Sequence, residues 1–214
     1  MSLRFPKQNV CNLLAVVVSI LLVPFAAFAE PPRQNTVFHH VPDAKLELRA
    51  VQYDGSVNGT LKVQVKNTDN VAHQFSATGL YFVPEGDPDS APQRLGAVGP
   101  LRLGNDPKER TEVDVPAGQT IEVALDVFCI DSHRGAPTSA NKFDVGATRM
   151  PAELSHAIEQ RADQAVSEAK AANPSAPPAA TRAQAKRAIQ SGVWSTRNQK
   201  WTKLDGEGKQ ESGK

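Results

Sequence analysis

Hydrophobic and polar residues alternate with a period of two over most of the stretch from Lys45 to Asp131. This period is typical of a β-strand with one buried face. The longest alternation places five residues on one side: Ile121, Val123, Leu125, Val127 and Cys129. Shorter runs of the same kind cover 46–51 and 61–66, and turn signals such as Asn58-Gly59 separate them. Six or seven short strands with frequent turns predict an immunoglobulin-like antiparallel β-sandwich over 45–150.

The pattern changes to a helical one after Met150. Apolar residues then recur at helical spacing in a stripe of Leu154, Ile158, Ala162, Ala165 and Ala169. This stripe predicts a helix over 151–172, and a proline–alanine linker follows over 173–180. A capping-box pattern from Thr181 to Gln184 predicts the start of a second helical segment over 181–204. The mainly β domain is therefore expected to be followed by two short α-helices and a disordered tail over 205–214.

The amino end has the pattern of a cleavable export signal over 1–29. Arg4 and Lys7 precede an apolar stretch, and Ala27-Phe28-Ala29 fits a small-residue cleavage site. Pro24 interrupts the apolar stretch, which is shorter than a membrane span requires. We therefore expect a protein that is secreted or resides in the periplasm or cell envelope, with no stable membrane insertion after cleavage. Residues 30–44 are polar, contain prolines, and are expected to form an extended arm.

Charge and composition narrow the classes of partner. The signal carries two of the 24 basic residues and none of the 23 acidic ones, so the mature chain has a net charge of −1. Binding to nucleic acid requires a concentrated basic face, which this balance does not favour. A protein or a surface glycan remains the expected class of partner.

One cysteine, Cys129, remains after cleavage, because Cys11 lies within the signal. An unpaired cysteine in an exported chain indicates a buried thiol, an intermolecular disulfide or a reactive group. The strand register turns Cys129 toward the core, where a free cysteine behaves as a small hydrophobic residue.

Two short segments also allow a reactive interpretation. Phe128-Cys129-Ile130-Asp131 and Ile189-Gln190-Ser191-Gly192-Val193-Trp194 together resemble the motif pair of the thioester-domain family, which are bacterial surface adhesion modules. The resemblance implies that the Cys129 sulfur and the Gln190 carboxamide join in an internal thioester with loss of ammonia. It also implies that Trp194 shields the bond, with Phe128 and Asp131 in support. The chain departs from the family pattern at Ile189, where a threonine is usual.

Other chemistry is less well supported by the residue pattern. His133 and Asp131 lie within four positions of Cys129, which leaves a cysteine hydrolase as a third hypothesis. His39-His40 with Asp43 does not have the spacing of a metal site, because adjacent residues of an extended segment point in opposite directions. No catalytic residue, cofactor or metal is therefore predicted.

The sequence thus predicts an exported binding or adhesion module, not an enzyme, with Cys129 and Gln190 as its thioester candidates. The alternative is a structural envelope or secreted module in which Cys129 is inert and buried.

Overall fold

The computed structural model describes residues 35–199 and residue 204. The predicted signal over 1–29 and the predicted tail over 205–214 lie outside the described residues, as does the start of the predicted arm. Within the described part, no helix has both the length and the apolar character needed to cross a membrane.

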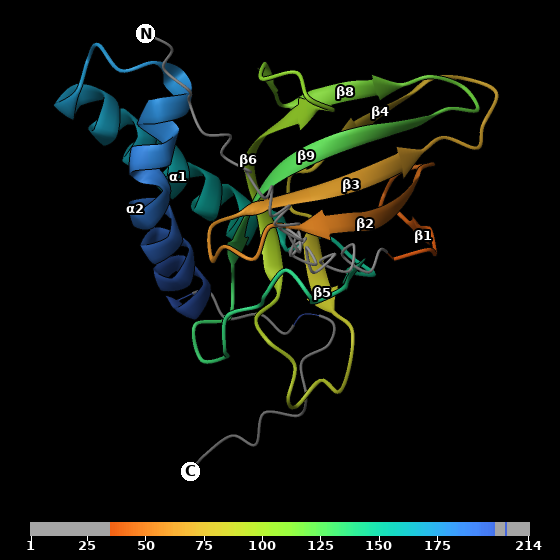
Figure 1. The fold of residues 1–214 in the computed structure, drawn as a ribbon, viewed down its shortest axis with the longest axis horizontal. Helices are drawn as coiled ribbons and strands as arrows, with labels where there is room; N and C mark the ends of the chain where they lie inside the picture. Colours follow the sequence, from red (N-terminus) through yellow and green to blue (C-terminus); the bar gives the residue numbers. More distant parts are fainter. Residues whose placement is uncertain (1–34, 200–203, 205–214) are drawn as a thin grey trace, which may run out of the picture. The chain divides into compact units, whose positions relative to one another are not determined.

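The described chain is mainly β, with two helices at its carboxyl end (Figure 1). Its elements are β1 His39–His40, β2 Glu47–Tyr53, β3 Thr60–Lys66, β4 His73–Ser76, β5 Tyr81–Pro84, β6 Leu95–Leu103, β7 Glu109–Arg110, β8 Glu112–Val115, β9 Thr120–Cys129, β10 Phe143–Val145, α1 Ala152–Ala172 and α2 Pro178–Gln199.

Most of the strands form one antiparallel sheet. Its order is β1-β2-β3-β9-β6-β5-β10, and β7 pairs with β6 to complete eight strands. A separate two-stranded sheet joins β4 and β8. The long strand β9 is central, since it pairs with β3 on one side and with β6 on the other.

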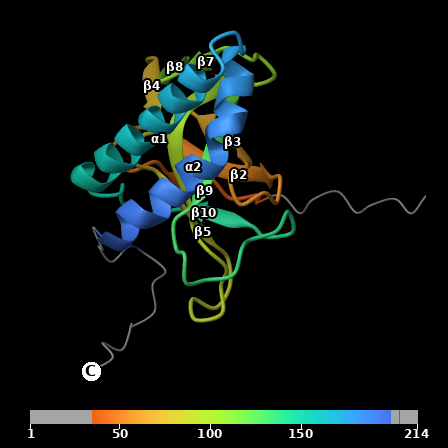
Figure 2. The ribbon, with the colours of Figure 1, turned by 90° about the vertical axis from the view of Figure 1, so that its left-hand side faces the viewer.

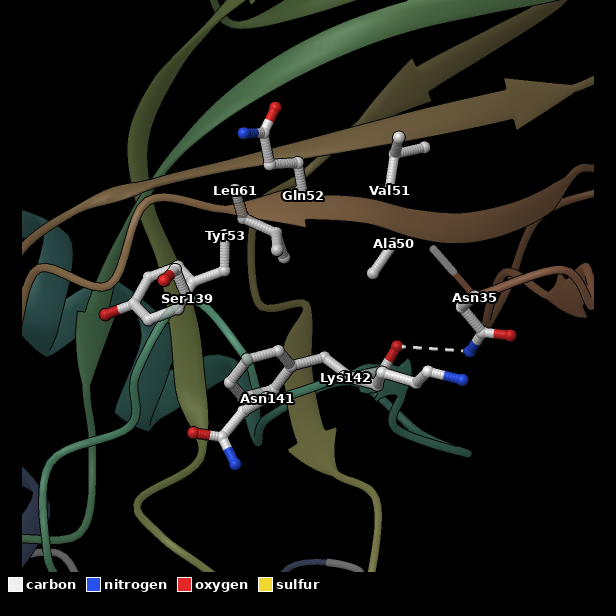
Figure 3. A pocket seen from close by; sticks show the side chains of 10 residues that line it. Asn35, Ala50, Val51, Gln52, Tyr53, Leu61, Ser139, Asn141 and Lys142 are labelled. Atoms are coloured by element: carbon white, nitrogen blue, oxygen red, sulfur yellow. Dashed lines mark hydrogen bonds between the residues drawn. The ribbon is translucent and has the colours of Figure 1, made fainter. Parts of the chain in front are cut away.

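The large sheet is nearly closed, because contacts join its two edge regions. Asn35 donates through Nδ2 to the backbone oxygen of Phe143 in β10 at 3.4 Å (Figure 3). His39 in β1 lies 3.1 Å from the carboxylate of Asp144, and the ring of Tyr53 in β2 meets that of Phe143 edge to face. The cavity between these edges measures about 10 Å³, which is room for roughly one water molecule.

The alternation along β9 separates two apolar clusters. The five residues predicted to share a face do so: Val123, Leu125, Val127 and Cys129 are buried in the first cluster, and Ile121 packs against it. Phe128 and Ile130 point the other way, into a second cluster with residues of the helices. Both faces of this strand end are therefore covered.

The helices cover the sheet face that carries Phe128. Figure 2 shows α1 and α2 in front of the strands, and α1 contacts β6 while α2 contacts β9. Leu154, Ile158, Ala162 and Ala165 are buried along α1, so the predicted helical stripe is confirmed. The start of the second helix differs from the prediction. Helix α2 begins at Pro178, and the Thr181 hydroxyl donates back to the Pro177 carbonyl inside the first turn, where it does not cap.

Candidate functional site

Cys129 is the last residue of β9, where its side chain is fully buried. Pairing with Leu95 in β6 fixes the register of this strand end. Burial, together with the nearby Asp131 charge, raises the pKa of the Cys129 thiol to about 12. The resting state of a free sulfur at this position is therefore the protonated thiol.

Gln190 reaches Cys129 from α2. It lies next to Ile189 on the buried side of the helix and is itself only 5% exposed. Its carboxamide makes two hydrogen bonds to the backbone of Cys129. The Cys129 N–H donates to Gln190 Oε1 at 3.1 Å, and Gln190 Nε2 donates to the Cys129 carbonyl at 2.7 Å. Both polar ends of a buried amide are thus satisfied by one residue.

This pairing has a chemical consequence for the Gln190 carbonyl. A backbone N–H aimed at a carbonyl oxygen polarises it and stabilises the charge that develops when a nucleophile attacks the carbon. Holding two reacting groups together also replaces a bimolecular encounter with a local one. The structure therefore places the Gln190 carboxamide against the residue that carries the sulfur.

The turn between β2 and β3 borders the same strand end. The Val57 carbonyl accepts a second contact from the Cys129 N–H, at 3.2 Å. Lys186, one helical turn before Gln190, donates to the Asn58 carbonyl at 3.0 Å. Helix α2 is therefore attached to this turn as well as to β9.

Trp194 lies one turn after Gln190 on α2. Its indole Nε1 donates to Gln93 Oε1 at 3.1 Å, and its ring is partly buried against the cluster that contains Cys129. Trp194, the predicted shielding residue, thus packs against the same cluster as the Cys129 side chain. Phe128 instead belongs to the cluster under the helices, so its support of the site is packing on the opposite face of β9.

Asp131 lies two residues beyond Cys129 and is bound by Arg94. The Arg94 guanidinium donates to both carboxylate oxygens, at 2.8 Å and 2.6 Å, and the Arg94 backbone N–H adds a third bond at 3.1 Å. Burial alone would raise the pKa of Asp131, but the Arg94 hydrogen bonds and charge, with the charge of Arg197, hold that pKa below its usual range. Asp131 is therefore an ionised carboxylate in a dry environment.

The geometry gives the hydrolase hypothesis little support. His133 is exposed in the turn after Asp131, whereas the Cys129 side chain is buried. A catalytic base must lie within hydrogen-bond reach of its nucleophile. Asp131, which would have to orient the histidine, is already bound by Arg94. Among the described residues, no group of three His, Cys, Asp or Glu side chains could hold a metal ion.

The sequence reasoning missed Arg94, Gln93 and Arg197 as neighbours of the site. Arg94 and Asp131 are 37 positions apart, and this pairing depends on the order of strands in the sheet. Arg197 had a detectable signal, since it follows Gln190 by seven residues on the same helix and so lies on nearly the same face.

Comparisons with known proteins give little guidance. The chain matches no protein family, and it matches no curated protein at a significant level. One similar solved structure is that of KdgF from Halomonas sp., at 11% identity over 51% of this chain and 83% of that chain. The TM-score of 0.14 is too low for this likeness to bear on fold or function.

Proposed function

We propose that this protein is an exported binding or adhesion module that acylates a partner through an internal Cys129–Gln190 thioester. The observation that carries the proposal is the pairing of the Gln190 carboxamide with the backbone of Cys129. Its location outside the cytoplasm is supported by the signal pattern over 1–29.

The proposed bond forms in one balanced substitution. The Cys129 sulfur attacks the side-chain carbonyl carbon of Gln190, a carbon–sulfur bond forms, and the carbon–nitrogen bond breaks. The departing amide nitrogen takes up the thiol proton and leaves as ammonia. The Cys129 N–H, which already donates to Oε1, would stabilise the oxyanion of the tetrahedral intermediate.

The thioester then transfers the acyl group of Gln190 to a partner. A primary amine or a hydroxyl of the partner attacks the same carbon, a new amide or ester bond forms, and the carbon–sulfur bond breaks as the proton of the nucleophile returns to Cys129. Burial of both residues supports the stability that the bond needs before the partner arrives, because water must be kept from it. The partner is expected to be a protein or a surface glycan.

A structural role is the alternative, and one observation favours it. Each polar group of the Gln190 carboxamide already has a hydrogen-bond partner. The attachment of α2 to the end of β9 is therefore a sufficient role for this side chain without any chemistry. In that case the protein is an envelope or secreted module with an inert Cys129.

We also propose the immunoglobulin-like sandwich as the finer description of the β domain. It is supported by the small β4–β8 sheet, whose Phe75, Val113 and Val115 share one apolar cluster with β2, β3 and β9. Two sheets that share a core are the defining arrangement of a sandwich. The near closure of the large sheet instead favours a barrel-like description.

Methylamine tests the acyl-transfer function directly. The mature chain, incubated with methylamine under native conditions, should gain one methylamine at Gln190 and release one titratable thiol at Cys129. The Cys129→Ala variant should take up none, and Ser132→Ala should behave as the unmodified chain, because Ser132 is exposed beyond the strand end. Absence of methylamine at Gln190, with a thiol that titrates fully on unfolding, supports the structural alternative.

A further inference from the structure

A buried ionic cluster lies beside the contact between Cys129 and Gln190. It consists of Arg94, Asp131 and Arg197, whose exposed fractions are 1%, 0% and 0%. Arg94 directly precedes Leu95, the register partner of Cys129, and its carbonyl accepts from the Ile130 N–H at 3.0 Å. Asp131 follows Cys129 by two residues. The ion pair therefore clamps the strand end on the carboxyl side of the sulfur.

Arg197 connects this cluster to α2. The helix advances 3.6 residues per turn, so Arg197 lies nearly two turns after Gln190 and on nearly the same side. Trp194 lies between them and bonds to Gln93, the residue before Arg94. The side of α2 that faces the strand end thus carries Gln190, Trp194 and Arg197 in order.

Electrostatics requires Arg197 to have a negative neighbour. A guanidinium does not lose its proton in a protein, and a fully buried charge is stable only near an opposite charge. The next residues of the two segments are in contact, since Asn198 Nδ2 donates to Ser132 Oγ at 3.2 Å, and the charge of Arg197 contributes to the low pKa of the Asp131 carboxyl. Arg94 supplies the bidentate hydrogen bonds to Asp131, and Arg197 adds a second buried positive charge on the side of α2 that faces this strand end.

We propose that Arg197 is a positioning residue that couples α2 to the Arg94–Asp131 ion pair and thereby holds the Gln190 carboxamide on the Cys129 backbone. The expected effect of Arg197 on acylation rests on the proposed function. Its positioning role does not, because the hydrogen bonds between Gln190 and the Cys129 backbone exist whether or not the thioester forms.

Arg197→Met tests the proposal, because methionine keeps a long apolar side chain but removes the charge, while the Arg94–Asp131 pair remains neutral as a unit. Arg182→Met is the matched control. Arg182 is also on α2, and its Nε lies 3.2 Å from Glu109 Oε1, so both variants remove one arginine charge from the same helix. The readout is hydrogen–deuterium exchange of the backbone amide at position 129, measured in a Cys129→Ala background where no bond to Gln190 can form.

The proposal expects Arg197→Met to accelerate exchange at position 129 by at least about tenfold, after correction for global stability, with little change in Arg182→Met. Equal acceleration in the two variants would overturn it, since Arg197 would then contribute only to overall stability. Arg197→Lys covers the case in which the methionine variant does not fold. Lysine keeps the charge but loses the planar guanidinium fork, so exchange at position 129 should still be about threefold faster than in the Cys129→Ala background. Exchange unchanged from the background in Arg197→Lys, with the methionine variant unfolded, would also overturn the proposal.

The same variants with Cys129 present separate this inference from the proposed function. A chain that never loses ammonia refutes the thioester, but the exchange result at position 129 still decides the role of Arg197. If Arg197→Met loses ammonia to the same extent as the unmodified protein, Arg197 has no effect on bond formation. The thioester itself is then still supported.

Discussion

The Gln190 carboxamide pairs with the backbone of Cys129 across 61 positions of sequence, with one hydrogen bond accepted at 3.1 Å and one donated at 2.7 Å. Such a two-point contact reproduces the way one β-strand residue bonds to its neighbour. It adds a side chain from a helix to the pairing at the last residue of β9. The end of the strand and the side of α2 are therefore one structural unit.

Loss of this contact should destabilise the fold. We expect Gln190→Ala, made in a Cys129→Ala background, to lower the free energy of unfolding by about 2 kcal/mol, because the buried carbonyl at position 129 loses its side-chain donor and the N–H keeps only its contact to the Val57 carbonyl. Urea denaturation measures this change. Gln164→Ala on the exposed side of α1 is the control, with an expected change within about 0.5 kcal/mol. Equal changes in the two variants would show that the Gln190 contact adds nothing to stability.

The Arg94–Asp131 pair should make stability depend on acid. The pKa of Asp131 is lowered in the folded chain, so its contribution is present above the ordinary aspartate pKa of about 4 and is lost as the pH falls through the folded value. We expect Asp131→Asn to lower the free energy of unfolding by about 3 kcal/mol at neutral pH and to flatten the decline of that free energy as the pH falls from about 5 toward about 2. Urea denaturation at neutral pH and across that range measures both effects. Parallel curves for the variant and the unmodified chain would contradict the prediction.

The Cys129 thiol should be unreactive in any folded chain that lacks the bond, such as Gln190→Ala. With a pKa of about 12, only roughly one part in 10⁵ of the thiol is ionised at pH 7, and the side chain is buried as well. We expect iodoacetamide to leave the native thiol unmodified over hours and to alkylate it within minutes in denaturant. The mass of the chain after each treatment records the outcome. Rapid labelling of the native form would show that Cys129 is accessible and ionised, contrary to the geometry.

Trp194 should protect the proposed bond from water. Replacement by alanine opens the partly buried side of the cluster that contains Cys129, so we expect hydrolysis of the thioester to accelerate by about tenfold. Trp194→Phe keeps an apolar ring but loses the indole hydrogen bond to Gln93. Its rate of thioester hydrolysis should lie between those of the unmodified chain and Trp194→Ala. The rate at which the chain regains the mass of one water measures hydrolysis. The same rate in all three chains would remove Trp194 from the shield.

Local pattern sufficed to predict the strand and helix types around the site. The period of two along Ile121–Cys129 correctly turned Cys129 toward the core, since side chains must alternate across a strand whatever its neighbours are. The spacing of Leu154, Ile158 and Ala162 correctly predicted a helix for the same kind of reason.

Long-range features were not predictable from pattern alone. The place of β9 between β3 and β6 depends on contacts among distant segments, and so does the pairing of Arg94 with Asp131. The near closure of the large sheet depends on Asn35 and His39, which the sequence presented only as part of a polar arm. Polar residues such as these reveal their role only once the partner strand is placed.

The most direct test of the central claim is the intact mass of the mature chain, measured under denaturing acid conditions without prior exposure to amines. The thioester account predicts a chain lighter by one ammonia than its sequence mass, and full sequence mass in both Cys129→Ala and Gln190→Ala. A full-mass chain, purified and kept at neutral pH, would contradict the account and leave Gln190 as a structural attachment of α2 to the end of β9.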